Sequence, residues 1–138
     1  MSVSVHVFDA MYGRPTIGMN VRLDRDLDGT WIEERRDQTD EGGSISDWVN
    51  APLARGSYQL EFDLDGYFSS LGVMPFYPVV TLRFRVLDPV QSHGISLLIT
   101  PYAYFTYQQN DMRTIPFIGA MAGMFGTPDS EPVRRMPS

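Results

Sequence analysis

Two histidines, His6 and His93, are the side chains best suited to proton transfer in this chain, which contains no cysteine and no lysine. An imidazole titrates near neutral pH, so it can take a proton from water and return it to a leaving nitrogen. Thiolate and Schiff-base chemistry are excluded because their nucleophiles are missing. His6 lies in an alternating stretch, Ser2 to Asp9, whose valines share one face while His6 takes the other. From these residues alone, the simpler interpretation is a surface histidine on an edge strand.

No spacing in the chain predicts a metal ion or a cofactor, and we expect neither. The acidic residues Asp24, Asp26 and Asp28 alternate and could bind calcium weakly. They lack the glutamate and the spacing of a calcium loop, so a solvated hairpin turn is the preferred interpretation. The net charge of −6 argues against a nucleic-acid partner.

Three other side chains have structural explanations. Asp9 ends the first alternating stretch, where we expect it to stabilise the turn near Arg14. Trp31 and Trp48 are expected to pack in the core or in an interface.

Short alternating stretches separated by turns run through most of the chain, and they predict an all-β fold, an antiparallel β-sandwich. The one expected helix covers Gly66 to Leu71. The expected strands cover residues 2–9, 19–24, 31–39, 44–48, 56–63, 78–87, 95–100 and 103–108.

The C-terminal part differs in composition from the rest. We expect one domain over residues 1–110 and an extension over 111–138. Within the extension, Ile115 to Phe125 is apolar and is expected to pack on a groove of its own subunit or of a neighbour, as a lid, a plug or an assembly contact. A flexible tail is expected after it. The chain shows no signal peptide and no apolar run of membrane-spanning length, so we expect a cytoplasmic protein without a membrane partner.

Five motifs occur in the order of one family: "HVFDAMYGRP" (6–15), "TDEGG" (39–43), "GSYQLEFD" (56–63), "YFSSLGVMPF" (67–76) and "LLITPYAYFTY" (97–107). With them the chain resembles the transthyretin and 5-hydroxyisourate hydrolase family. The resemblance implies a transthyretin-like sandwich of two four-stranded sheets with one short helix. It also implies a homotetramer, a dimer of dimers, whose sites lie in a channel between subunits.

The site residues of the hydrolases carry over only in part. The family's first histidine corresponds to His6, but its arginine corresponds to Ser44 and its second histidine to Gly94. The family's C-terminal Tyr-Arg-Gly-Ser becomes Tyr107-Gln108-Gln109-Asn110. His93 is adjacent to Gly94, yet strand alternation points it to the opposite face unless a bulge at Gly94 turns it back.

The resemblance implies a channel wall that is less charged and more aromatic than that of the hydrolases. Such a wall suits a neutral, flat, partly apolar molecule better than an anionic one. Arg35 and Arg36 could replace the missing arginine, although a solvated strand face is the preferred use of both. With His6 as the catalytic residue, the expected substrate-binding residues are Phe8, Ser44, Gly94, Ser96, Leu98, Phe105, Tyr107 and Gln108.

Three functions fit these residues. The first choice is a divergent hydroxyisourate-hydrolase-like enzyme that opens, closes or isomerises the ring of a small cyclic substrate, with His6 as acid and base. The second is 5-hydroxyisourate hydrolysis itself, as in urate breakdown, which requires most of the charged site residues to be dispensable. The third is a non-catalytic binder of small molecules, as transthyretin is.

Overall fold

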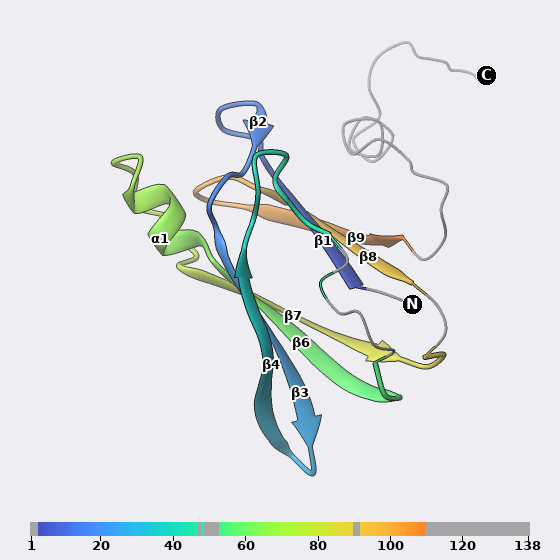
Figure 1. Cartoon of the computed structure of the whole chain (residues 1–138). Helices are drawn as coiled ribbons and strands as arrows, with labels where there is room; N and C mark the ends of the chain where they lie inside the picture. The colour runs from blue at the N-terminus through green and yellow to red at the C-terminus, as the bar shows by residue number, and fades with distance from the viewer. Residues whose placement is uncertain (1–2, 47, 49–52, 90–91, 110–138) are drawn as a thin grey trace, which may run out of the picture.

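Two β-sheets face each other in the computed structural model, which describes residues 3–46, 48, 53–89 and 92–109 (Figure 1). Sheet A contains β2 (Arg14–Pro15), β1 (Val3–Asp9), β8 (His93–Ile99) and β9 (Tyr104–Gln109) in that order, and β5 (Ser44–Ile45) also pairs with β1. Sheet B contains β4 (Thr30–Gln38), β3 (Asn20–Leu27), β6 (Gly56–Asp63) and β7 (Val79–Val86). The expected transthyretin-like β-sandwich is confirmed, but sheet A has five strands among the described residues where four were expected, because the two-residue strands β2 and β5 both pair with β1.

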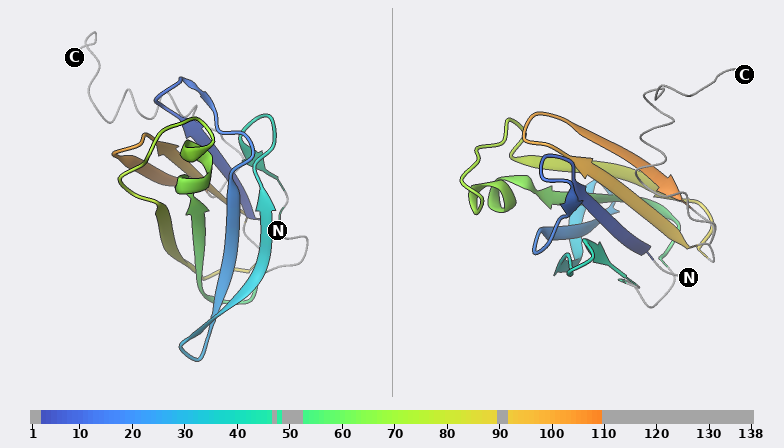
Figure 2. Two further views of the ribbon diagram at one scale, coloured as in Figure 1. Left: turned by 90° about the vertical axis from the view of Figure 1, so that its left-hand side faces the viewer. Right: turned by 90° about the horizontal axis from the view of Figure 1, so that it is seen from above.

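The core is formed by buried side chains of both sheets. Figure 2 shows the ribbon of the two sheets from two further sides. Alternate side chains of a strand point to opposite faces, and in β1 every second residue is buried. The buried positions of β1 are Asp9 and the three valines that the sequence pattern placed on one face. The other core positions of the central strands include Val21, Leu23, Leu60, Phe62, Leu97 and Ile99.

The central strands of sheet A, β1 and β8, are parallel, with Val3 opposite His93 and Asp9 opposite Ile99. All other strand pairs among the described residues are antiparallel. The sequence pattern did not predict this parallel pair, because alternation specifies the face of each side chain and not the direction of the partner strand. The pairing places the outward side chains of β1 and β8 side by side.

The single described helix, α1 (Leu64–Ser69), begins two residues earlier than expected. The carboxylate of Asp63 accepts a hydrogen bond of 2.9 Å from the backbone N–H of Gly66, and this N-cap fixes the start of the helix. Leu64 and Phe68 anchor the helix because both side chains are fully buried in the core. The helix thus closes one end of the sandwich (Figure 1).

No helix in the described part of the chain is long and apolar enough to cross a membrane. The expected C-terminal extension, residues 111–138 with its apolar stretch 115–125, lies outside the described residues.

Candidate active site on the outer face of sheet A

A tight turn before β5 brings this short strand against β1. Gly43 has a φ of +77°, and a Cβ there would collide with the carbonyl oxygen of Val7. The Gly43 carbonyl accepts a hydrogen bond of 2.8 Å from the backbone N–H of Val7. One carboxylate oxygen of Asp40 accepts hydrogen bonds of 2.9 Å from the backbone N–H groups of Gly42 and Ser44. The turn therefore fixes the position of Ser44.

Ser44 contacts His6 directly. The two residues are opposite each other in the ladder between β1 and β5, so their side chains share the outer face of sheet A. Nδ1 of His6 lies 2.9 Å from Oγ of Ser44. The family resemblance predicts that Ser44 contacts substrate, and its hydroxyl is also within hydrogen-bond distance of the histidine.

His6 is half-buried, and its burial lowers the pKa of the imidazole. The negative charge of Asp40 opposes this change, although its effect is the smaller of the two. The imidazole is therefore neutral at pH 7 and can accept a proton. These are the properties of a general base.

The polar side chains of the site form one row across sheet A. Ser96 of β8 lies opposite His6, and Tyr107 of β9 lies opposite Ser96. The row therefore runs from Ser44 through His6 and Ser96 to Tyr107, with all four side chains on one face.

An apolar row lies beside the polar one. It consists of Phe8, Leu98 and Phe105, which are consecutive ladder partners on β1, β8 and β9. The rings of Phe105 and Tyr107 are adjacent, with centroids 6.2 Å apart. The apolar row lies next to the polar row, with Leu98 buried and both phenylalanines partly exposed.

The β8–β9 register separates the remaining predicted channel residues. Gly94 lies one row beyond Ser96 and faces the same side as His6. Gln108 lies opposite Ile95, whose side chain points to the core. The prediction that Gln108 lines the channel is therefore wrong, since strand alternation places it on the face opposite Tyr107. Asn110 lies outside the described residues.

His93 does not replace the missing second histidine. It pairs with Val3 on the inner side of sheet A and is 8% exposed. Burial lowers the pKa of His93, and the charge of Asp88 opposes this to a smaller extent. The strand alternation that predicted this orientation is confirmed, because no bulge interrupts the β1–β8 ladder.

Asp9 has the structural role that its position predicted. Its carboxylate is fully buried and accepts hydrogen bonds from the backbone N–H groups of Met11 and Tyr12. The hydroxyl of Tyr67 donates a hydrogen bond of 2.6 Å to the other carboxylate oxygen. Burial, followed by this contact with Asp9, raises the pKa of Tyr67 to about 12.

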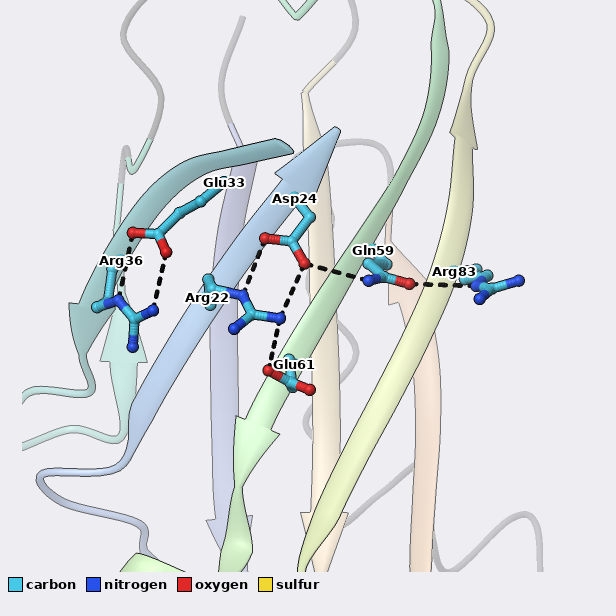
Figure 3. A network of polar contacts seen from close by, with 7 residues as sticks. All are labelled: Arg22, Asp24, Glu33, Arg36, Gln59, Glu61 and Arg83. Carbon is cyan, nitrogen blue, oxygen red and sulfur yellow. Dashed lines mark hydrogen bonds and ion pairs between the residues drawn. The ribbon is translucent and has the colours of Figure 1, made fainter. Parts of the chain in front are cut away.

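Charged residues on the outer face of sheet B pair with one another (Figure 3). The buried carboxylate of Asp24 accepts hydrogen bonds from Arg22 at 2.9 Å and from Gln59 at 3.1 Å. Arg36 forms an exposed pair with Glu33, so it cannot replace the family's arginine on sheet A. Hollows of about 260 and 550 Å³ flank this network. We place the site on sheet A because the base and the hydroxyl group are adjacent there.

The remaining candidates have structural roles. Asp26 accepts a hydrogen bond from the backbone N–H of Gly29 in a hairpin turn, and the described residues contain no cluster of side chains that could hold a metal ion. Trp48 is buried in the core, whereas the ring of Trp31 lies 5.1 Å from the guanidinium of Arg83 on sheet B.

Comparison with other proteins agrees with the fold. The family model "HIUase/Transthyretin family" matches residues 3–109. A 5-hydroxyisourate hydrolase of Caulobacter vibrioides is 35% identical over 113 residues, which cover 77% of this chain and 96% of the relative. The structure of a Klebsiella pneumoniae 5-hydroxyisourate hydrolase has a TM-score of 0.71 at 25% identity, covering 79% of this chain and 99% of the other. Sea bream transthyretin in complex with thyroxine has a TM-score of 0.75 at 25% identity, covering 83% of this chain and all of the other. The chain belongs to the HIUase/transthyretin family.

Proposed function

We propose that the protein is a divergent hydrolase-type enzyme that acts on the ring of a small cyclic substrate at the outer face of sheet A, with His6 as acid and base. The observation that carries the proposal is the half-buried imidazole of His6 with its Nδ1 at 2.9 Å from the hydroxyl of Ser44. A neutral histidine with a fixed hydrogen-bond partner is an arrangement suited to proton transfer. The names of the hydrolase relatives support the reaction class.

The two rows of side chains have separate tasks in this proposal. The apolar row of Phe8, Leu98 and Phe105 receives the flat face of the substrate. The hydroxyl groups of Ser96 and Tyr107, on the same face as His6, are assigned to the ring carbonyl oxygens in this proposal. His6 accepts a proton from the attacking group and then delivers it to the ring nitrogen as the carbon–nitrogen bond breaks.

The charge of the face favours a neutral ring. No arginine shares a ladder position with His6 among the described residues of sheet A. The family resemblance implies that Ser44 and Gly94 stand where the hydrolases have an arginine and a second histidine. An anionic substrate oxygen therefore lacks the guanidinium that would bind it. We propose neutral cyclic amides and imides as the substrate class.

Two other functions have specific support. Hydrolysis of 5-hydroxyisourate is the function that the names of the curated relatives give, although the residues at Ser44 and Gly94 argue against it. Binding of a small molecule without catalysis is supported by the sea bream transthyretin structure, which was determined with thyroxine. The presence of His6 beside a hydroxyl group favours the enzyme.

The proposal includes assembly and location. A second copy of the chain would cover the outer face of sheet A in a homotetramer and exclude water from the site. The edge strands β7 and β9 are available for pairing between subunits, because each has one hydrogen-bonded neighbour among the described strands. We place the protein in the cytoplasm. Light scattering and cell fractionation test these two points.

Turnover measurements test the function. We expect the purified protein to open at least one neutral five- or six-membered cyclic amide or imide, and His6→Gln to reduce kcat/KM by about 100-fold or more. Gln108→Ala is the matched control, because Gln108 faces away from the site on the same sheet, and it should leave kcat/KM unchanged. We expect 5-hydroxyisourate to be hydrolysed no faster than it decays spontaneously. Full turnover by His6→Gln would refute the proposal.

A further inference from the structure

We propose that Ser44 is the nucleophile of this enzyme and forms a covalent ester with the substrate. The proposal rests on the function proposed above, which assigns proton transfer to His6. It adds a second catalytic residue at the position where the family resemblance indicates only a lost arginine.

The geometry of the pair meets the first requirement of an activated serine. A nucleophile and its base must be within hydrogen-bond reach, about 2.6–3.2 Å. Oγ of Ser44 and Nδ1 of His6 are 2.9 Å apart. In the tautomer that carries its proton on Nε2, Nδ1 accepts the hydroxyl proton of Ser44. Both side chains are partly exposed on the outer face of sheet A, so a ligand on that face can reach them.

The backbone keeps the serine in this position without using its hydroxyl. The N–H of Ser44 donates to the carboxylate of Asp40 at 2.9 Å, and its carbonyl accepts from the N–H of Asp40 at 2.9 Å. The ladder position opposite His6 fixes the direction of the side chain. Oγ is therefore positioned toward the imidazole by the main chain, and its hydroxyl proton is available for transfer.

Asp40 supplies a negative charge that acts on the base. Its negative charge raises the pKa of His6, against the larger effect of burial. The same charge stabilises the imidazolium that forms when His6 takes the serine proton. Asp40 acts through His6 and through the turn, so it is a positioning residue.

The reaction then has two balanced steps. Oγ of Ser44 attacks the ring carbonyl carbon, His6 takes the hydroxyl proton and returns it to the ring nitrogen, and the carbon–nitrogen bond breaks to leave an ester on Ser44. In the second step water attacks the ester, His6 takes a proton from the water and delivers it to Oγ, and the ring-opened acid is released.

Cysteine substitution tests the pair without the natural substrate, because the chain contains no other thiol. We expect Ser44→Cys to react with iodoacetamide about 10-fold faster than the matched variant Ser46→Cys, since His6 promotes the thiolate. Ser46 is exposed two residues further along the chain. The advantage should disappear in the double variant with His6→Gln. Equal rates for the two single cysteine variants would overturn the proposal.

A covalent probe tests the serine itself. A fluorophosphonate should label Ser44 in the intact protein, and peptide mass spectrometry should locate the label there. Labelling should be absent from Ser44→Ala and present in Ser46→Ala. Labelling elsewhere with none at Ser44 would contradict the proposal.

Turnover separates this proposal from the function on which it rests. We expect Ser44→Ala to lose kcat by about 100-fold or more on any cyclic amide that the protein opens. If Ser44→Ala retains kcat while His6→Gln loses it, then His6 activates water and the serine proposal fails alone. If both variants retain kcat, the proposed function fails as well.

Discussion

Replacement of Gly43 by alanine tests how the turn before β5 builds the site. Gly43 has a φ of +77°, and a Cβ there would collide with the Val7 carbonyl oxygen. A left-handed residue with a Cβ costs about 1–2 kcal/mol. Separation of β5 from β1 would also lose the hydrogen bond of 2.8 Å from Val7 to Gly43, worth about 0.5–1.5 kcal/mol. When the displacement of the backbone is included, we expect Gly43→Ala to lower the free energy of unfolding by about 2–4 kcal/mol.

Gly42→Ala is the matched control, one residue earlier in the same turn. Gly42 has no positive φ, and its Cβ would meet only the Asp40 carboxylate at 3.5 Å, an ordinary contact. The stability of both variants is measured by urea unfolding at one fixed protein concentration, and the midpoints and slopes of the two curves are compared. Gly43→Ala should also lose turnover, because Ser44 moves away from His6. Equal midpoints for the two variants would refute the explanation given for this turn.

Other predictions concern the buried polar contacts. Tyr67→Phe removes the hydroxyl that donates to the buried Asp9 carboxylate, so its free energy of unfolding in urea should fall by about 1.5–3 kcal/mol. The exposed control Tyr102→Phe should lose about 0.5 kcal/mol or less. Because the pKa of Tyr67 is raised from 10.0 to about 12, its contribution to stability is complete below pH 10 and is lost as the pH rises toward 12; unfolding of Tyr67→Phe should lack this component. Burial lowers the pKa of His6 below 6.5, so the acid limb of the pH–rate profile should lie below pH 6.5. Asp40→Asn removes the charge that raises this pKa, so it should move the limb to lower pH. An acid limb above pH 6.5 would contradict the role of His6 as the base.

Strand alternation predicted most of the fold and part of the site. It placed the valines of β1 in the core and His6 on the opposite face, and the ladders confirm this. It also predicted that His93 points inward. The same argument applied to Gln108 would have removed it from the channel wall, because Tyr107 lies on the site face and the next residue must lie on the other.

Contacts between distant segments were not readable from the sequence. The hydrogen bond between His6 and Ser44 joins residues 38 positions apart, and it depends on the turn at Gly43. The resemblance marked the position of Ser44 only as the loss of an arginine. The parallel direction of β8 was equally hidden, because its alternation fits either direction. The side chain of Asp63 could have signalled the earlier start of α1, since aspartate is a preferred N-cap residue.

The pairing of β1 with β8 affects how the chain can fold. Val3 opposes His93, so β1 leaves the ribosome well before β8, the strand that it needs in order to occupy the centre of sheet A. Pairing over such a separation closes a long loop and is slow. During that interval β1 can pair only with the short strands β2 and β5, and the edge that β8 will cover stays unpaired. The strand that carries His6 is therefore among the last to be completed, and the face proposed as the site forms only after β8 has paired with β1.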